Sequence, residues 1–93
     1  MLPKYRKPTH PGEILSEEFL KPMGISQTKL ATHLGWSHAK VNEIINAKRG
    51  VTAETALAFA DAFGSSAEFW INLQTNHDLW EAQQEHKKRK KIA

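Results

Sequence analysis

The stretch "SQTKLATHLGWSHAKVNEII", residues 26 to 45, decides the fold that this sequence predicts. It contains two short apolar patterns of helical spacing, and each follows a serine that can cap a helix. Gly35 stands between them, and glycine can adopt the left-handed conformation that closes a helix without a steric penalty. We therefore expect two short helices, capped by Ser26 and Ser37 and joined by a tight turn.

The spacing within this stretch is that of a helix-turn-helix. Ala31 is small, Gly35 follows four residues later, and Val41 and Ile44 lie six and nine residues beyond the glycine. The small residue lets the second helix cross close to the first, and the two aliphatic residues anchor the second helix from beneath. The pattern therefore predicts a helical pair whose second member presents a polar front.

The rest of the chain shows helical periodicity, without the strict alternation of a half-buried strand. His10–Pro11 opens a helix that Pro22 and Gly24 end, because proline suits the first helical position and cannot continue a helix. Thr52 caps another helix, which carries a regular apolar stripe up to Gly64.

A last helix follows at once, and Ser65 and Glu68 have the spacing of a capping box. The expected fold is all-α, a five-helix bundle that contains a helix-turn-helix. We expect an N-terminal arm over residues 1–8, one domain over residues 9–86, and a basic C-terminal tail over residues 87–93.

Length and composition restrict the class of protein. The chain of 93 residues suits a single domain with a modest core, so a partner chain could add stability. It has no cysteine, which excludes disulfides and thiolate metal sites, and its basic start lacks the apolar segment of a secretory signal. No apolar run approaches the roughly 18 residues of a membrane span. We expect a cytoplasmic protein without a membrane association.

Charge is distributed unevenly along the chain. The net charge is +3, but residues 87–91 supply five positive charges, so the remainder is acidic. Within that acidic remainder, residues 26–50 carry four cationic side chains and only one carboxylate, a local charge of +3. A positive segment in an acidic body is typical of a surface that binds a polyanion. The basic tail itself we interpret as a solvated helix end, with contact to DNA or to an acidic partner as the alternative.

Four stretches of the chain carry a resemblance to a known family: "THPGEIL" at 9–15, "ISQTKLATHLG" at 25–35, "VNEIINAKRGVTAETALAFADAFG" at 41–64 and "SSAEFWINLQTNHDLW" at 65–80. Over residues 9 to about 82, the chain resembles the HigA/VapI group of small antitoxins, within the Xre/Cro (phage-repressor-like) class of helix-turn-helix proteins. The resemblance implies a five-helix, phage-repressor-like domain that forms a homodimer. It also implies binding to double-stranded DNA at its own operator and neutralisation of a RelE-like toxin, a ribosome-dependent mRNA nuclease.

The resemblance assigns roles to individual positions. The exposed start of the recognition helix, where bases would be read, corresponds to Ser37, His38, Ala39, Lys40, Asn42 and Glu43. The positions that would contact phosphates correspond to Gln27, Asn46, Lys48 and Arg49. Trp36 departs from the group, which usually has a small aliphatic residue there, so we expect a displaced turn or a partly exposed indole.

Physical chemistry supports these roles without the family. A helix N-terminus presents unpaired N–H groups and a partial positive charge, so Gln27 and its turn suit a phosphate. In a major groove, Ala39 could lie against a thymine methyl group, and His38 and Lys40 could donate to guanine. Glu43 could accept from cytosine or simply narrow the angle of approach.

The last helix carries more apolar surface than one stripe can bury. At about 100° per residue, its apolar side chains point in several directions, which predicts a second chain packed against it. The candidate residues of this dimer interface are Trp70, Ile71, Leu79 and Trp80.

No pattern predicts an enzyme. The five histidines include no pair spaced by four residues, and the chain has no phosphate-binding loop or nucleophile elbow. We expect no catalytic residue, no metal and no cofactor. Two alternatives stay open: a free-standing phage-type transcriptional repressor without a toxin partner, and an antitoxin whose helix-turn-helix no longer reads DNA.

Overall fold

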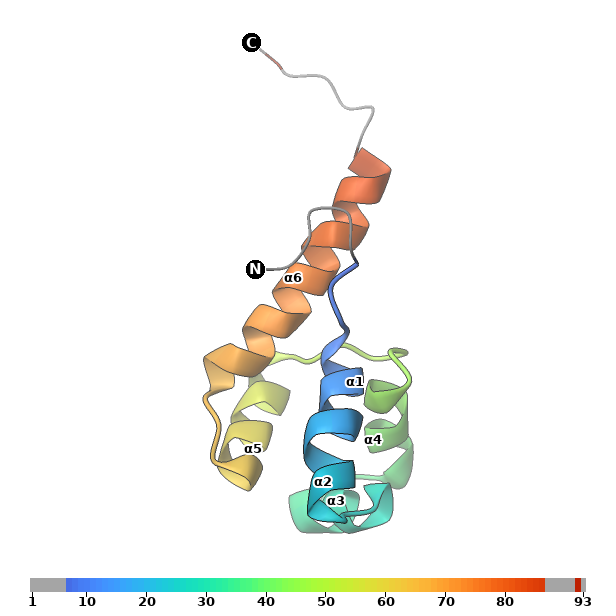
Figure 1. The fold of residues 1–93 in the computed structure, drawn as a ribbon, viewed down its shortest axis with the longest axis vertical. Helices are drawn as coiled ribbons and strands as arrows, with labels where there is room; N and C mark the ends of the chain where they lie inside the picture. The colour runs from blue at the N-terminus through green and yellow to red at the C-terminus, as the bar shows by residue number, and fades with distance from the viewer. Residues whose placement is uncertain (1–6, 87–91, 93) are drawn as a thin grey trace.

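The computed structural model describes residues 7–86 and 92, and over these residues the chain is all-helical, without a strand (Figure 1). The first helix is continuous through three segments: α1 (Pro11–Ile14), η1 (Leu15–Leu20) and α2 (Lys21–Met23). The others are α3 (Gln27–Leu34), α4 (His38–Ile45), α5 (Ala53–Phe63) and α6 (Ala67–His86). The expected five-helix architecture is therefore confirmed. Most of the expected basic tail, residues 87–91 and 93, and most of the expected arm, residues 1–6, lie outside the described residues.

Local capping interactions explain where four of the helices begin. Three caps are those that the sequence predicts: Ser26 Oγ accepts from the N–H of Lys29 (3.0 Å), Ser37 Oγ from Lys40 (3.1 Å) and Thr52 Oγ1 from Thr55 (3.3 Å). The fourth was not predicted: His10 Nδ1 accepts from the Gly12 N–H (2.9 Å). Each cap satisfies a backbone donor that has no partner within its helix. The helix starts are thus set by residues that are neighbours in sequence.

The start of α6 differs from the prediction. The expected capping box of Ser65 and Glu68 is wrong, because Ser66 Oγ accepts from the backbone N–H of Phe69 (3.0 Å) and the helix begins at Ala67. Ser65 is instead occupied by a tertiary contact: its Oγ accepts a hydrogen bond from the Trp70 indole Nε1 (2.8 Å). A buried indole N–H needs an acceptor, and Ser65 supplies it.

The first helix contains a wider turn, η1, with π-helical hydrogen bonds. The Lys21 N–H donates to the carbonyl of Ser16, five residues back. Leu15 and Leu20, also five residues apart, are both buried in the core. In an ideal α-helix, residues five apart point in clearly different directions around the helix axis. The wider turn brings Leu15 and Leu20 closer to the same side, so both side chains reach the core.

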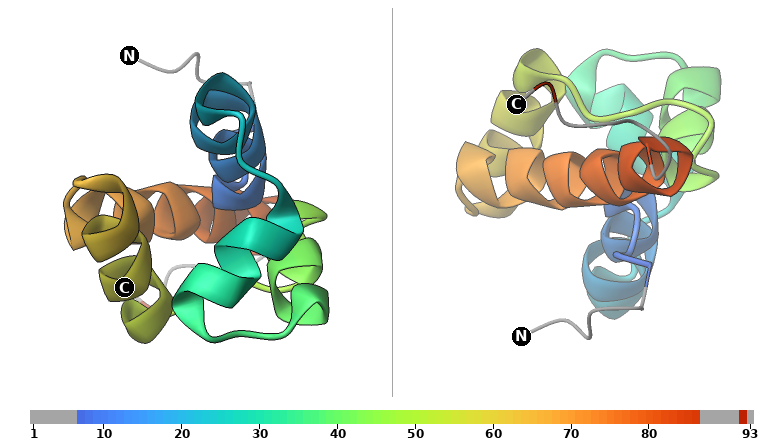
Figure 2. Two further views of the ribbon diagram at one scale, coloured as in Figure 1. Left: turned by 90° about the horizontal axis from the view of Figure 1, so that it is seen from below. Right: turned by 90° about the horizontal axis from the view of Figure 1, so that it is seen from above.

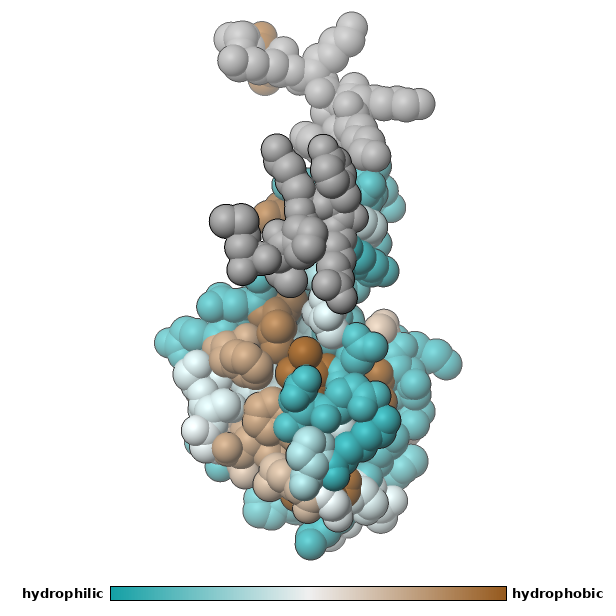
Figure 3. Space-filling model, viewed as in Figure 1, coloured by the Kyte–Doolittle hydropathy of each residue, from teal (hydrophilic) through white to brown (hydrophobic). Residues whose placement is uncertain are grey.

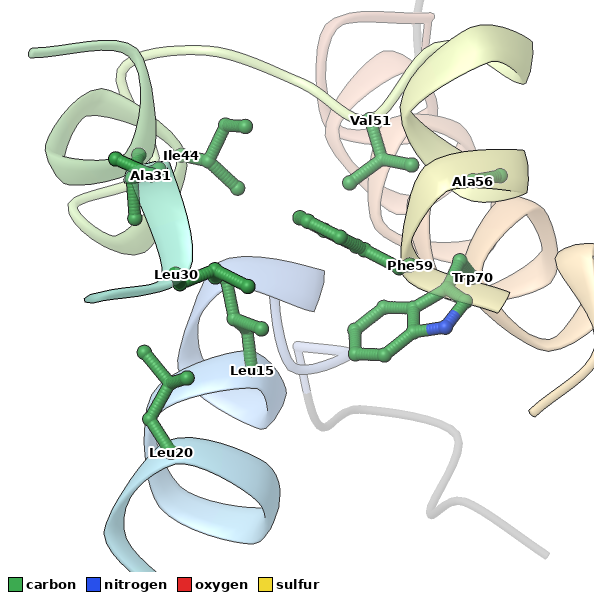
Figure 4. Packing of buried hydrophobic residues seen from close by; sticks show 10 residues of the cluster. Leu15, Leu20, Leu30, Ala31, Ile44, Val51, Ala56, Phe59 and Trp70 are labelled. Atoms are coloured by element: carbon green, nitrogen blue, oxygen red, sulfur yellow. The ribbon is translucent and has the colours of Figure 1, made fainter. Parts of the chain in front are cut away.

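The core joins the helices around two aromatic side chains (Figure 4). Trp70 of α6 and Phe59 of α5 are both 0% exposed, and their ring centroids lie 4.9 Å apart. The expected role of Trp70 in a dimer interface is therefore wrong, since its side chain has no free surface within the monomer. A position that helical geometry places off the main stripe is buried here because α5 and η1 both pack against it.

The helices form a compact cluster from which α6 projects. Helices α3 and α4 lie together on one side of this cluster, and α5 lies against the beginning of α6 (Figure 2). The second half of α6 extends beyond the other helices (Figure 1). No helix within the described residues has both the length and the apolar character needed to cross a membrane.

Candidate nucleic-acid interface

The turn between α3 and α4 has regular geometry. Gly35 adopts the left-handed conformation (φ 72°), and its N–H donates to the carbonyl of Thr32 (3.2 Å). The N–H of Trp36 donates to the carbonyl of Ala31 (2.9 Å), which completes the usual closure of a helix by glycine. The tryptophan does not displace the turn. Its indole is half-buried, as expected, and packs against Phe59 with a centroid distance of 5.9 Å.

Helix α4 is held from behind by side chains and by backbone. Val41 and Ile44 are 0% exposed in the core. On α1, a Cβ added at Gly12 would overlap the carbonyl oxygen of Ile44 and come within 3.0 Å of the Ile45 Cα. Only a glycine allows the two backbones to approach this closely. The position of α4 relative to α1 is therefore narrowly determined.

The front of α4 faces away from this packing. Ser37, His38 and Ala39 are exposed, as the sequence predicts for residues that would read bases. Lys40 is only half-buried, and its Nζ lies 3.9 Å from the centroid of the Trp36 ring. The structure thus brings the predicted residues together at the N-terminal end of α4, with the lysine turned back over the turn.

A chain of side-chain amides links α4 to the start of α3. Asn46 Nδ2 donates to the carbonyl of Asn42 (3.0 Å) and to its Oδ1 (3.1 Å). Asn42 Nδ2 in turn donates to Gln27 Oε1 (3.0 Å). Three predicted DNA-contacting residues are therefore linked by hydrogen bonds. At one end of this series, the Nε2 group of Gln27 remains able to donate to another molecule.

Glu43 anchors the loop that follows α4. Its carboxylate accepts from Arg49 Nε (3.0 Å) and Nη2 (2.7 Å), and its carbonyl accepts from the N–H groups of Lys48 (2.8 Å) and Arg49 (3.2 Å). Within this loop Ala47 has φ 60°, the one positive φ outside glycine in the described chain. The Glu43 carboxylate is thus paired with Arg49 within the chain, whereas the sequence suggested that it accepts from cytosine or narrows the angle of approach.

Two residues, Gly12 and Gln74, and the contact of Trp36 with Lys40 were not predicted from the sequence. Gly12 carried a signal, since a glycine in the first turn of a helix is costly unless space requires it. Trp36 was noted as an unusual residue at its position, but its cation–π contact with Lys40 was not predicted. Gln74 carried no signal: its Oε1 accepts from the Val51 N–H (2.7 Å) and so ties the loop before α5 to α6.

A polar pocket of about 570 Å³ lies behind the site, between residues 7–10, α1, the end of α4 and α6. The rings of His10 and His77 meet edge to face in it, with centroids 5.0 Å apart. Burial lowers the pKa of His10, and the neighbouring His77 lowers it further. Within residues 7–86, His, Cys, Asp and Glu form no group of three that could hold a metal ion.

The remaining dimer candidates lie on α6 in different environments. Ile71 is half-buried against the core, and Trp80 is half-buried with Lys7 Nζ 5.7 Å from its ring centroid. Leu79 is 55% exposed on the projecting half of the helix. Of the predicted set, Leu79 is therefore the most available for contact with another chain.

Comparison with known proteins identifies the family. The helix-turn-helix family model matches residues 17–70, more than half of the chain. Virulence-associated protein I of Dichelobacter nodosus is 51% identical over 76 residues, which cover 82% of this chain and 70% of that protein. Antitoxin HigA-1 of Vibrio cholerae is 40% identical over 88 residues, covering 94% and 82% of the two chains.

Solved structures agree over nearly the whole length. Antitoxin GraA superposes with a TM-score of 0.86 at 41% identity and covers 94% of this chain and 99% of its own. GraA in complex with its operator gives 0.84 at 40% identity, covering 100% and 99%. Pseudomonas aeruginosa antitoxin HigA with the higBA promoter gives 0.85 at 36% identity, covering 92% and 99%. With its capped α3–α4 pair and these relatives, the chain belongs to the Xre-type helix-turn-helix family, which is non-enzymatic, and within it to the HigA/VapI group of antitoxins.

Proposed function

We propose that this chain binds the operator upstream of its own gene as a homodimer, represses its operon, and neutralises a RelE-like mRNA nuclease. The observation that carries the proposal is the placement of α4. Its back is held by the close approach of Gly12 to Ile44, and its polar front stands free in the described chain. A major groove admits one such helix.

DNA binding is supported by the structural relatives. The HigA and GraA structures with promoter or operator DNA match this chain over almost its full length. By analogy, His38, Ala39 and Lys40 read base edges, while Lys48 and Arg49 face the phosphates. Gln27 donates to a phosphate through Nε2, because its Oε1 is already held by Asn42.

A homodimer would place two copies of α4 on one side of a DNA duplex. The projecting half of α6 offers Leu79 and Trp80 as the contact surface. Two recognition helices that read successive major grooves must lie about 34 Å apart, one turn of B-DNA. A dimer through α6 leaves both copies of α4 free for this task.

The toxin partner follows from the family. The relatives include a named antitoxin, HigA-1, and the resemblance implies a RelE-like nuclease as the protein that is neutralised.

The first experiment is a fluorescence-anisotropy titration with the DNA upstream of the gene, and a scrambled duplex of the same composition as control. A sequence-specific repressor prefers the native duplex, and its affinity falls steeply with salt, by a slope of about −0.9 per neutralised phosphate on a log–log plot. Equal weak binding to both duplexes would contradict the proposal.

A second experiment separates the two activities. Any short reading frame next to the gene that encodes a small basic protein is co-expressed with the chain, and cell growth is measured. A double variant, Lys40→Ala with Arg49→Ala, is expected to lose operator binding and to retain neutralisation. If the adjacent product is harmless without this chain, the protein is a free-standing repressor instead.

A further inference from the structure

We infer that Trp36 is a positioning residue for DNA recognition: its indole holds the Lys40 ammonium at the front of α4 and so directs this lysine to one base pair of the operator. The inference rests on the proposed DNA binding and adds to it a residue outside the positions that the family assigns to base or phosphate contacts.

The contact between the two side chains is close. Lys40 Nζ lies 3.9 Å from the centroid of the Trp36 ring, well within the 6 Å over which a cation is attracted to an aromatic face. Tryptophan is the strongest of the aromatic partners for this interaction. Lys40 follows Trp36 by four residues, and side chains on a helix lean back toward its N-terminus. The lysine therefore reaches the ring in the direction that its backbone favours.

The indole is itself fixed, so the lysine is held on a rigid support. The backbone N–H of Trp36 donates to the carbonyl of Ala31, and its indole ring packs against Phe59 of the core. The backbone of Lys40 is held as well, because its N–H donates to Ser37 Oγ (3.1 Å). Lys40 is half-buried, whereas the residues directly before it, His38 and Ala39, are exposed.

A restrained lysine contacts DNA differently from a free one. A free lysine side chain loses rotamer freedom when it binds, and a lysine that is already positioned loses less. With one side of the ammonium against the ring, its remaining N–H donors are available to an acceptor beside the start of α4. They suit the O6 and N7 acceptors of a guanine at the edge of the major groove. A small aliphatic residue at position 36 would leave the ammonium free to move among neighbouring acceptors.

The test is a double-mutant cycle on operator binding, with Trp36→Leu, Lys40→Met and the double variant. Trp36→Leu is expected to weaken operator binding by roughly two- to fivefold, the range of a partly exposed cation–π pair. In the Lys40→Met background the same replacement is expected to have no further effect. Trp36→Phe keeps an aromatic face and should retain most of the affinity.

Matched controls separate positioning from folding. Lys48→Met removes a lysine that is not on the ring, and its effect should add to that of Trp36→Leu. Thermal unfolding by circular dichroism identifies any variant that fails to fold. If Trp36→Leu does not fold, the cycle with Lys40→Met is measured with Trp36→Phe in its place. An equal loss from Trp36→Leu with and without Lys40 would overturn the inference, because that loss would be structural. A gain in affinity would overturn it too, since the ring would then withhold the lysine.

An NMR measurement without DNA distinguishes failure of this inference from failure of the proposed function. The ε-methylene protons of Lys40 should be shifted upfield by the ring current of Trp36, and the shift should disappear in Trp36→Leu. Absence of the shift overturns the inference whatever the protein binds. An upfield shift in a protein that does not prefer its operator means that the proposed DNA binding has failed, and the role of Trp36 in DNA recognition fails with it.

Discussion

Each half of α6 contains a tryptophan and a leucine, but the large apolar side chains of the two halves differ in burial. In the first half, Trp70 is 0% exposed, contacts Phe59 and donates its indole N–H to Ser65. In the second half, Leu79 is 55% exposed and Trp80 is half-buried beside Lys7. The first half completes the core, and the second half is only partly covered by the other described residues.

The front of α4 and the projecting half of α6 also differ in the surface that each exposes. The front of α4 is polar, and Gly12 fixes its back through a backbone contact. The projecting half of α6 carries two large apolar side chains, Leu79 and Trp80, among polar ones, and fewer elements pack against it (Figure 1). On the face drawn in Figure 3, hydrophobic residues gather near α5 and the hydrophilic ones lie beside them, over the first helix. A surface for DNA must be rigid and polar, whereas a surface for another chain needs exposed apolar area.

The largest effect is expected from a tryptophan in the core. Trp70→Ala should lower the free energy of unfolding by about 3–5 kcal/mol, because it leaves a large cavity and removes a hydrogen bond. Trp80→Ala should cost much less in the same urea titration. Equal losses would mean that both halves of α6 belong to one core.

The next largest effect concerns the contact between α1 and α4. Gly12→Ala should destabilise the fold by about 1–3 kcal/mol and weaken operator binding, because the added Cβ displaces the backbone of Ile44. Gly24→Ala is the matched control: it strains a left-handed residue (φ 65°) but meets no atom within 4 Å. If both variants lose stability and both keep full operator affinity, the position of α4 does not depend on Gly12.

Leu79→Glu should separate the proposed dimer without unfolding the monomer. A charge placed in an apolar interface is expected to raise the dimer dissociation constant about tenfold or more, equivalent to ~1.4 kcal/mol. Sedimentation velocity measures the change. Leu57→Glu, at an equally exposed leucine of α5 (60%), should leave association unchanged. Loss of the dimer in the α5 variant alone would move the interface away from α6.

Glu43→Gln should increase DNA affinity by a small factor. The replacement releases Arg49 from its carboxylate and removes a negative charge from the surface that we propose faces the phosphates. The gain should be about two- to fivefold at low salt, in line with the modest strength of an exposed ion pair. Glu54→Gln on α5 controls for net charge. A loss of affinity and of sequence preference would show that Glu43 reads a base after all.

The smallest effect is a dependence of stability on pH. Because the pKa of His10 is lowered from its ordinary value of 6.5 by burial and by His77, the folded state binds fewer protons than the unfolded state below that value. Stability should therefore fall as the pH falls from about 6.5 toward the lowered pKa of the folded state. His10→Asn keeps a capping side chain and should reduce this slope. An unchanged slope in equilibrium unfolding between pH 7 and 5 would assign it to another group.

Much of the fold could be predicted because its signals are local. Ser26, Ser37 and Thr52 cap helices within three residues of themselves, and Gly35 closes α3 through its own conformation. Such interactions depend on neighbours in the sequence, so the pattern alone indicates them. The all-α architecture and the helix-turn-helix follow from these signals.

Other features depend on which element lies opposite a side chain, and only the tertiary structure decides that. Trp70 is core because α5 and η1 meet there, and Ser65 is an acceptor for its indole for the same reason. Glu43 is committed to Arg49 by the path of the following loop. The sequence by itself determined where the helices before α6 begin and which residues come to the front of α4. The tertiary structure decided which of those residues already form hydrogen bonds or ion pairs within the chain, because two side chains must meet in space to pair. Helical periodicity gives the direction of a side chain but not its partner.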